Sequence, residues 1–185
     1  MSCVTLTKSR KLNCISKMPG VRAIGILPFD GVNRILKTAT GVVTLVPAVA
    51  DLDVTIARFE LKNTTTNFIE NGISGGDNRS TGVTGNIPII LNVPSGGDVE
   101  LNILVEELLK GEVVLFLEMN DGTIKIAGSQ LGALAITADD QTGGTIGDLN
   151  GYTITFNTLE PDFSRGYILT EPALTEYAAA IMPYV

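Results

Sequence analysis

The chain has 185 residues, 44% of them apolar and 18% charged, which is enough for one domain with a buried core and too apolar for a disordered chain. It contains neither histidine nor tryptophan, so the commonest general base and transition-metal ligand is missing. The net charge of −7 divides into +6 over residues 1–40 and −13 over residues 41–185.

Residues 1–19 are predicted to form a basic N-terminal arm ahead of a single β-rich domain over residues 20–185. Such an arm either lies on the acidic surface of its own subunit or reaches an acidic face on a neighbouring copy. Binding of nucleic acid is disfavoured, because the arm has no interleaved aromatic residues and an acidic body repels phosphate. The basic residues assigned to a subunit interface are Lys8, Arg10, Lys11 and Lys17.

The N-terminus MSCVTLTKSRKLNC lacks the apolar segment of a signal peptide, and no apolar run approaches the ~18 residues of a spanning helix. We therefore expect no membrane partner. Cys3 and Cys14 form no CxxC pair, and without histidine they cannot complete a zinc site. Whether these two cysteines pair with each other stays open.

Strands are expected over residues 21–29, 40–46 and 53–62, the last with a bulge near Arg58 where its alternation slips. The following stretch NGISGGDNRSTGVTG (71–85) contains five glycines and is predicted to be a long loop that orders on assembly. Its candidate interface residues are Gly75, Gly76 and Arg79.

A strand over residues 86–93 contains Pro88, which favours a sheet edge or a strand start. The stretch DVELNILVEELLK (98–110) predicts an α-helix with an apolar stripe, and EVVLFLEMNDGTIKIAG (112–128) predicts a hairpin that turns at Asn120-Asp121-Gly122.

Residues 131–138 fit either a strand or a loop, and residues 152–160 predict a strand. A short C-terminal helix should follow Pro172. The apolar end, including Tyr184 and Val185 as interface candidates, packs either on its own core or on a neighbouring subunit. The chain is thus expected to be mainly β (α+β), an antiparallel β-sandwich or barrel with one packed helix at about residues 98–110.

The stretch DDQTGGTIGDLNGYTITF (139–156) is the strongest candidate for a binding loop. Its acids do not have EF-hand spacing, although a loosely bound calcium at Asp139 and Asp140 is an alternative. A phosphate loop would need a cation, and none occurs between Lys125 and Arg165. We interpret the stretch as a turn that leads into a strand.

No catalytic, cofactor-binding or metal-binding residue is predicted, because no histidine is present to activate a serine and no GxSxG elbow occurs. The prediction is that the protein is not an enzyme. Two other classes of protein are alternatives. A hydrolase with paired carboxylates and a β-sandwich binding module for a carbohydrate or peptide would both benefit from an aromatic patch, which this composition does not favour.

Two stretches carry a resemblance to a known family. LTKSRKLNC (6–14), followed by Pro-Gly and a strand, resembles the start of small structural proteins from tailed phages of gut bacteria, including crAss-like phages. GDLNGYTITFNTLEP (147–161) resembles their C-terminal region, and a helix followed by a DG hairpin resembles the tail-tube fold. The family's Gly-Gly-Ile-Lys and aromatic strand are replaced here by Pro19-Gly20-Val21-Arg22, with no aromatic residue before Phe29.

This resemblance implies a tail-tube subunit or a ring at the head–tail junction, in six- or twelve-fold homo-oligomeric rings. Their lumen would let DNA pass without sequence-specific binding. The implied partners are other copies and neighbouring tail or portal-ring proteins, and the implied location is the virion tail after assembly in the host cytoplasm. A head decoration or connector protein is the alternative within the structural class.

Overall fold

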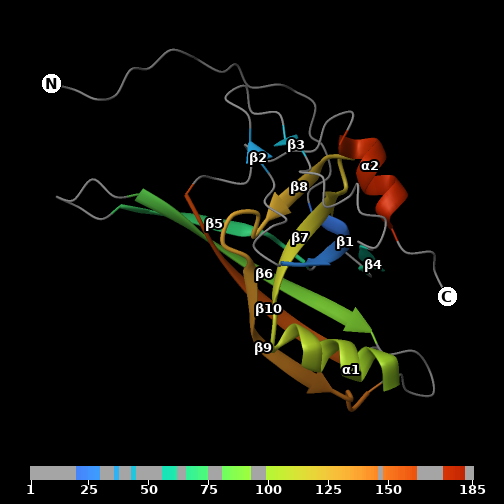
Figure 1. The fold of residues 1–185 in the computed structure, drawn as a ribbon. Helices are drawn as coiled ribbons and strands as arrows, with labels where there is room; N and C mark the ends of the chain where they lie inside the picture. Colours follow the sequence, from blue (N-terminus) through green and yellow to red (C-terminus); the bar gives the residue numbers. More distant parts are fainter. Residues whose placement is uncertain are drawn as a thin grey trace, which may run out of the picture.

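In a computed structural model of the chain, the described residues are 20–29, 36–37, 43–44, 56–61, 66–74, 81–92, 99–145, 148–161 and 173–181. The protein is mainly β, as the sequence predicts. One antiparallel sheet of eight strands dominates, with a two-stranded sheet and two short helices beside it (Figure 1). The elements in chain order are β1 (Val21–Pro28), β2 (Leu36–Lys37), β3 (Val43–Thr44), β4 (Ala57–Glu60), β5 (Ile69–Ser74), β6 (Thr81–Asn92), α1 (Val99–Leu108), β7 (Glu112–Met119), β8 (Ile124–Ala127), β9 (Ala133–Gln141), β10 (Gly151–Glu160) and α2 (Ala173–Ala180).

The main sheet runs in the order β4-β1-β7-β9-β10-β6-β5, and β8 pairs with β7 beside this path. Its two halves share one core, because inward side chains of β1 and β7 and of β6 and β10 belong to the same buried cluster. Helix α1 closes that cluster with Leu101, Val105 and Leu108, three residues of the stripe that the sequence predicts.

A second, smaller core lies on the opposite face of β1, β7 and β8. Helix α2 lies on this side of the sheet (Figure 1). There the C-terminal helix α2 places Tyr177 against Phe116, with ring centroids 5.0 Å apart. The backbone N–H of Ile56 donates to the carbonyl of Ala180, which ties the end of α2 to the start of β4. Within the described residues, the apolar C-terminal helix therefore packs on its own subunit.

The hairpin of β7 and β8 forms where it is expected. Gly122 takes the left-handed φ of +86° that the turn requires, and the Asp121 carboxylate accepts the backbone N–H of Thr123 at 2.9 Å. Strand β7 is central, as its two apolar faces predict, because it pairs with β1, β8 and β9.

The prediction of a loop over residues 71–85 is wrong for most of that stretch. Residues up to Ser74 belong to β5 and residues from Thr81 belong to β6, which leaves 75–80 outside the described residues. Gly85 is required by close packing, because a Cβ at this position would collide with Oγ1 of Thr158. The ambiguous stretch 131–138 is also resolved, since Ala133 begins β9.

The expected bulge near Arg58 is absent, because β4 pairs with β1 in continuous register. Irregularities occur instead at Arg22 in β1 and at Ile136 in β9, where one partner strand has an extra residue. Pro88 lies two residues beyond Asn86, the last β6 residue that pairs with β5, so β6 is locally an edge strand at the proline.

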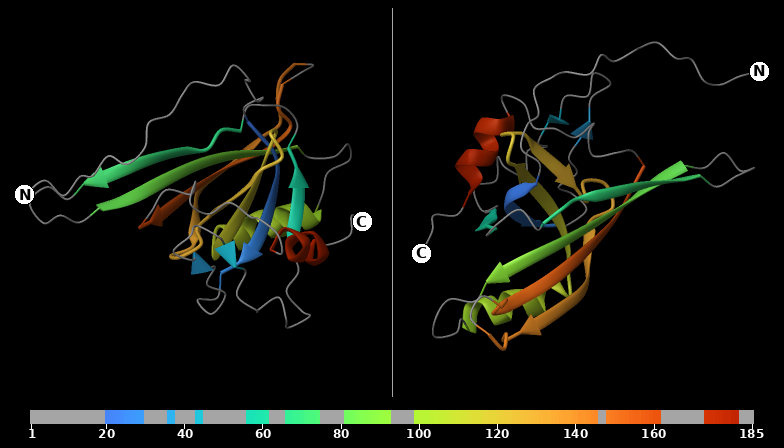
Figure 2. Two further views of the ribbon diagram at one scale, coloured as in Figure 1. Left: turned by 90° about the horizontal axis from the view of Figure 1, so that it is seen from above. Right: turned by 180° about the vertical axis from the view of Figure 1, so that it is seen from behind.

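The outer face of strands β9, β10, β6 and β5 points away from α1. Seen from behind, these strands lie in front of α1 (Figure 2). Five large apolar side chains on this face are about half exposed: Ile69, Ile73, Leu134, Ile136 and Leu159. We call this set the outer sheet face. Neither described helix is long and apolar enough to cross a membrane.

Candidate functional site

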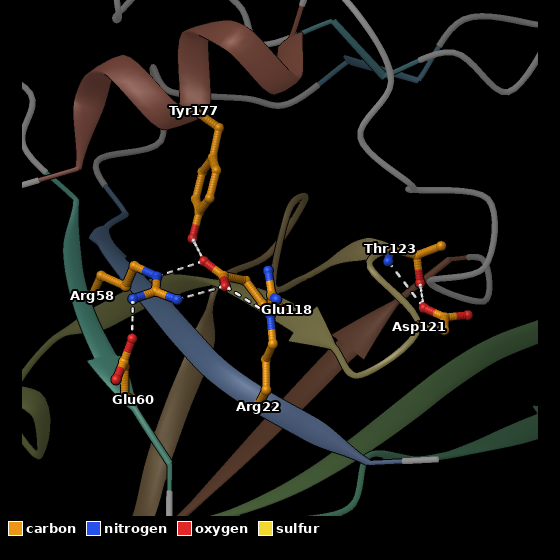
Figure 3. Close-up of polar contacts among 7 residues, drawn as sticks. All are labelled: Arg22, Arg58, Glu60, Glu118, Asp121, Thr123 and Tyr177. Carbon is orange, nitrogen blue, oxygen red and sulfur yellow. Dashed lines mark hydrogen bonds and ion pairs between the residues drawn. The ribbon is translucent and has the colours of Figure 1, made fainter. Parts of the chain in front are cut away.

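Among the described residues, a cluster of charged side chains surrounds Glu118, near the end of β7 and beneath α2 (Figure 3). The side chain is only 4% exposed although it is ionisable. Nε of Arg58 donates to Oε1 at 2.7 Å and Nη2 donates to Oε2 at 2.8 Å, so the guanidinium holds the carboxylate with two bonds. Arg58 belongs to β4 and Glu118 to β7, the two strands that flank β1 in the sheet.

Two further groups complete the cluster. The Tyr177 hydroxyl donates to Oε1 of Glu118 at 3.0 Å, and Nε of Arg22 lies 3.3 Å from Oε2. Arg22 can reach this carboxylate because the irregularity in β1 falls at its position. Arg58 also donates from Nη1 to the exposed Glu60 at 3.0 Å.

These contacts fix the protonation of the cluster. The Arg58 hydrogen bonds, with a smaller contribution from Tyr177, lower the pKa of Glu118 below its ordinary value although burial opposes this. The bond to Glu118 raises the pKa of Arg58. Burial, followed by the charge of Glu118, raises the pKa of Tyr177. Glu118 is therefore held as a carboxylate whose two oxygens each have two partners, which leaves it unsuited to act as a base.

Room for the Tyr177 hydroxyl depends on Gly25 of β1. A Cβ at position 25 would lie 2.7 Å from that hydroxyl oxygen and 3.0 Å from Cγ2 of Ile56. The cluster therefore holds α2 against the sheet. Its residues lie far apart in the chain, and no short sequence motif marks them.

A second buried carboxyl, that of Glu160, lies at the end of β10 on its inward side. Its Oε1 accepts the backbone N–H of Gln130 at 3.2 Å and the hydroxyl of Ser129 at 3.4 Å, whereas Oε2 has no hydrogen-bond partner among the described residues. Burial raises the pKa of Glu160 although hydrogen bonds from the 128–130 segment oppose the shift. The described partners of Glu160 are a serine hydroxyl and a backbone N–H, and neither forms a general acid–base pair with this carboxyl.

The stretch 139–156 connects two strands as interpreted from the sequence. Asp139 and Asp140 lie in β9 opposite Thr153 and Tyr152, and consecutive strand residues point to opposite faces, so the two carboxylates do not converge on one ion. Asp148 accepts the backbone N–H groups of Gly144 and Thr145 at 2.9 and 2.8 Å, which lowers its pKa. Asp148 therefore stabilises the turn, in agreement with the interpretation of this stretch as a turn.

No group of three or more potential metal ligands occurs among the described residues. The nine residues assigned to a subunit interface all lie outside the described part of the chain: Lys8, Arg10, Lys11, Lys17, Gly75, Gly76, Arg79, Tyr184 and Val185. The two features that sequence reasoning missed are the Glu118 cluster and the outer sheet face. The second had a local signal, since Leu134, Ile136 and Leu159 alternate with small or polar residues.

Comparison with protein-family models, with curated proteins and with solved structures finds no match to this chain.

Proposed function

We propose that this protein is a non-enzymatic structural subunit of a phage virion, which assembles with copies of itself into the rings of a tail tube or of the head–tail junction. The observation that carries the proposal is the outer sheet face. Five large apolar side chains lie half exposed on one side of the sheet, a pattern that marks protein–protein contact surfaces.

The edge of the sheet supports the same conclusion. Among the residues that the structure describes, strand β5 pairs only with β6, and β5 includes neither lysine nor proline, two residues that commonly protect an edge. Ile73 near the end of β5 is 50% exposed. An edge strand of this composition is suited to contact with another subunit.

The charge of the described surface fits a channel for DNA. Exposed carboxylates occur on α1 and on several strands, whereas Arg22 and Lys110 are the exposed ones among the basic side chains whose exposure the structure describes. Carboxylates that face phosphates repel them, so DNA would slide through a lumen of this kind without binding.

The experiment is negative-stain electron microscopy of the purified protein over a concentration series at low salt. The proposal predicts rings or tubes with a central hole wide enough for duplex DNA. Single particles at every concentration would count against it and favour a head decoration protein or a ligand-binding module.

A further inference from the structure

Glu160 is a buried carboxyl for which the proposed function has no use. It ends strand β10, is 5% exposed and is the only charged residue of that strand. On one side its backbone belongs to the sheet, because Glu160 pairs with Val83 of β6. On the other side the pairing of β10 with β9 ends at Thr158 and Ala133. Glu160 therefore lies beside the turn 128–132 that leads into β9.

We call residues 128–132 the β8–β9 turn. Gly128 and Gly132 both take left-handed φ angles, of +75° and +77°. The backbone N–H of Gly132 donates to the carbonyl of Gly128 at 3.1 Å, which closes the turn. Ser129 is buried, whereas Leu131 is 56% exposed. The turn therefore lies at the surface, with Ser129 on its inner side.

The hydrogen bonds from this turn to Glu160 are long for bonds to a charged group. They measure 3.2 Å from the N–H of Gln130 and 3.4 Å from the hydroxyl of Ser129, whereas bonds to a carboxylate are typically about 2.5–2.9 Å long. Both bonds end on Oε1, and the buried Oε2 has no partner among the described residues. A charge on this carboxyl is therefore poorly compensated, and a neutral carboxyl costs less to bury.

No charged side chain of the described residues faces Glu160. The β8–β9 turn and β6 contain no charged residue, and the aspartates of β9 lie opposite the other end of β10. Lys125 of β8 lies 6.0 Å from the ring of Phe68, and Glu112 of β7 lies beside Gly132. Burial raises the pKa of Glu160 against the hydrogen bonds from the turn, and no charge of a described residue contributes to this shift.

The β8–β9 turn is the element that can move to let water reach this carboxyl. Strand β10 is held by its ladder with β6, which continues from Gly151 to Glu160 itself. The turn gives Glu160 two long bonds and closes on itself through the bond from Gly132 to Gly128. Opening a surface turn costs less free energy than separating two paired strands.

We propose that Glu160 and the β8–β9 turn form a pH-sensitive switch, in which the turn is closed over the neutral carboxyl and opens as Glu160 ionises. The pKa of Glu160 is higher under the closed turn than in water, where an ordinary glutamate has a pKa of about 4.3. The closed turn is therefore favoured below the pKa in water and is lost as pH rises through the higher pKa. This switch goes beyond the proposed function and does not depend on it.

The test is hydrogen–deuterium exchange of the full chain by NMR at pH 5 and pH 8, corrected for the pH dependence of the intrinsic exchange rate. The amide of Gly132 reports on the turn, because it bonds to the carbonyl of Gly128 and not to Glu160. The amides of the central strand β7 are the reference. Far-UV circular dichroism checks that each variant is folded.

In the wild type, the protection of the Gly132 amide should fall several-fold from pH 5 to pH 8, while that of β7 stays constant. Each pKa unit between the closed and the open turn changes the opening equilibrium by about tenfold. Glu160→Gln should show no such fall, because the amide is neutral at both pH values. Glu112→Gln is the matched control and should keep the fall, since Glu112 is an exposed carboxyl beside the same turn.

Three outcomes would overturn the switch. Equal protection of Gly132 at both pH values in the wild type does so without any variant. A fall that persists in Glu160→Gln, or disappears in Glu112→Gln, would assign the titration to another group. A fall of the same size in β7 would mean that the whole fold loosens and that the turn does not open by itself.

Discussion

Glu118 shows how a buried charge can be structural. Its carboxylate receives hydrogen bonds from Arg58 and Tyr177 and an ion pair from Arg22, so all its acceptor positions are used within the fold. Arg58 binds a buried glutamate and an exposed one, Glu60, with the same guanidinium. These two acids therefore allow a matched comparison of burial.

We predict that Glu118→Gln lowers the free energy of unfolding by about 2–4 kcal/mol, because Arg58 would lose its buried counter-charge. Glu60→Gln should change it by less than about 1 kcal/mol, since the Glu60 side chain is 71% exposed. Urea unfolding of both variants measures the difference. Equal effects would show that burial of the pair does not matter.

The two buried glutamates should respond to pH in opposite senses. The pKa of Glu118 is lowered in the fold, so its contribution to stability is present above the unfolded pKa and is lost as pH falls through the folded pKa. The pKa of Glu160 is raised, so its effect is the reverse: stability falls as pH rises from the unfolded pKa through the folded one.

Glu160→Gln should therefore remove the part of the stability loss that occurs as pH rises from about 4.3, the ordinary glutamate pKa, toward neutral. The amide keeps an oxygen for Gln130 and Ser129 and carries no charge to desolvate. Thermal unfolding of the variant and the wild type from pH 4 to 8 gives both profiles. Parallel profiles would mean that Glu160 does not titrate in this range.

At the scale of elements, the sequence predicted correctly those helices and turns that form through contacts between residues close together in the chain. The α1 stripe and the Asn120-Asp121-Gly122 hairpin depend on residues within a few positions of each other, and both were found as expected. The loop over residues 71–85 was mistaken because its residues pair as strands β5 and β6, and Gly85 is required there by a distant neighbour, Thr158. The Glu118 cluster could not be predicted, because β4, β7 and α2 meet only in the folded chain.

The docking of α2 provides a prediction at this scale. Gly25→Ala should loosen α2 and cost about 1–3 kcal/mol, because its Cβ would meet the Tyr177 hydroxyl at 2.7 Å. Tyr177→Phe in the same chain removes that oxygen and should restore part of the loss. Gly82→Ala is the control, since the nearest atoms to its Cβ are 3.8 Å away. Chemical unfolding of Gly25→Ala, Tyr177→Phe alone, the double variant and Gly82→Ala tests the coupling, and strictly additive losses would contradict it.

At the scale of the whole molecule, the charge asymmetry of the sequence separates a basic N-terminal segment from an acidic body. Removal of residues 1–17 should leave a folded domain, because the described cores contain no residue before Val21, and should prevent assembly. Circular dichroism reports the fold and electron microscopy reports the rings. Normal rings from the truncated chain would show that the basic segment has no part in assembly.

The proposed function treats the chain as a subunit that associates with its own copies until a ring closes, and the outer sheet face is the observation behind it. Native mass spectrometry of the wild type at rising concentration tests this most directly, because it counts the copies in each particle. The account predicts a closed species of six or twelve copies that grows at the expense of monomer. A monomer at all concentrations, or a dimer that grows no further, would contradict it.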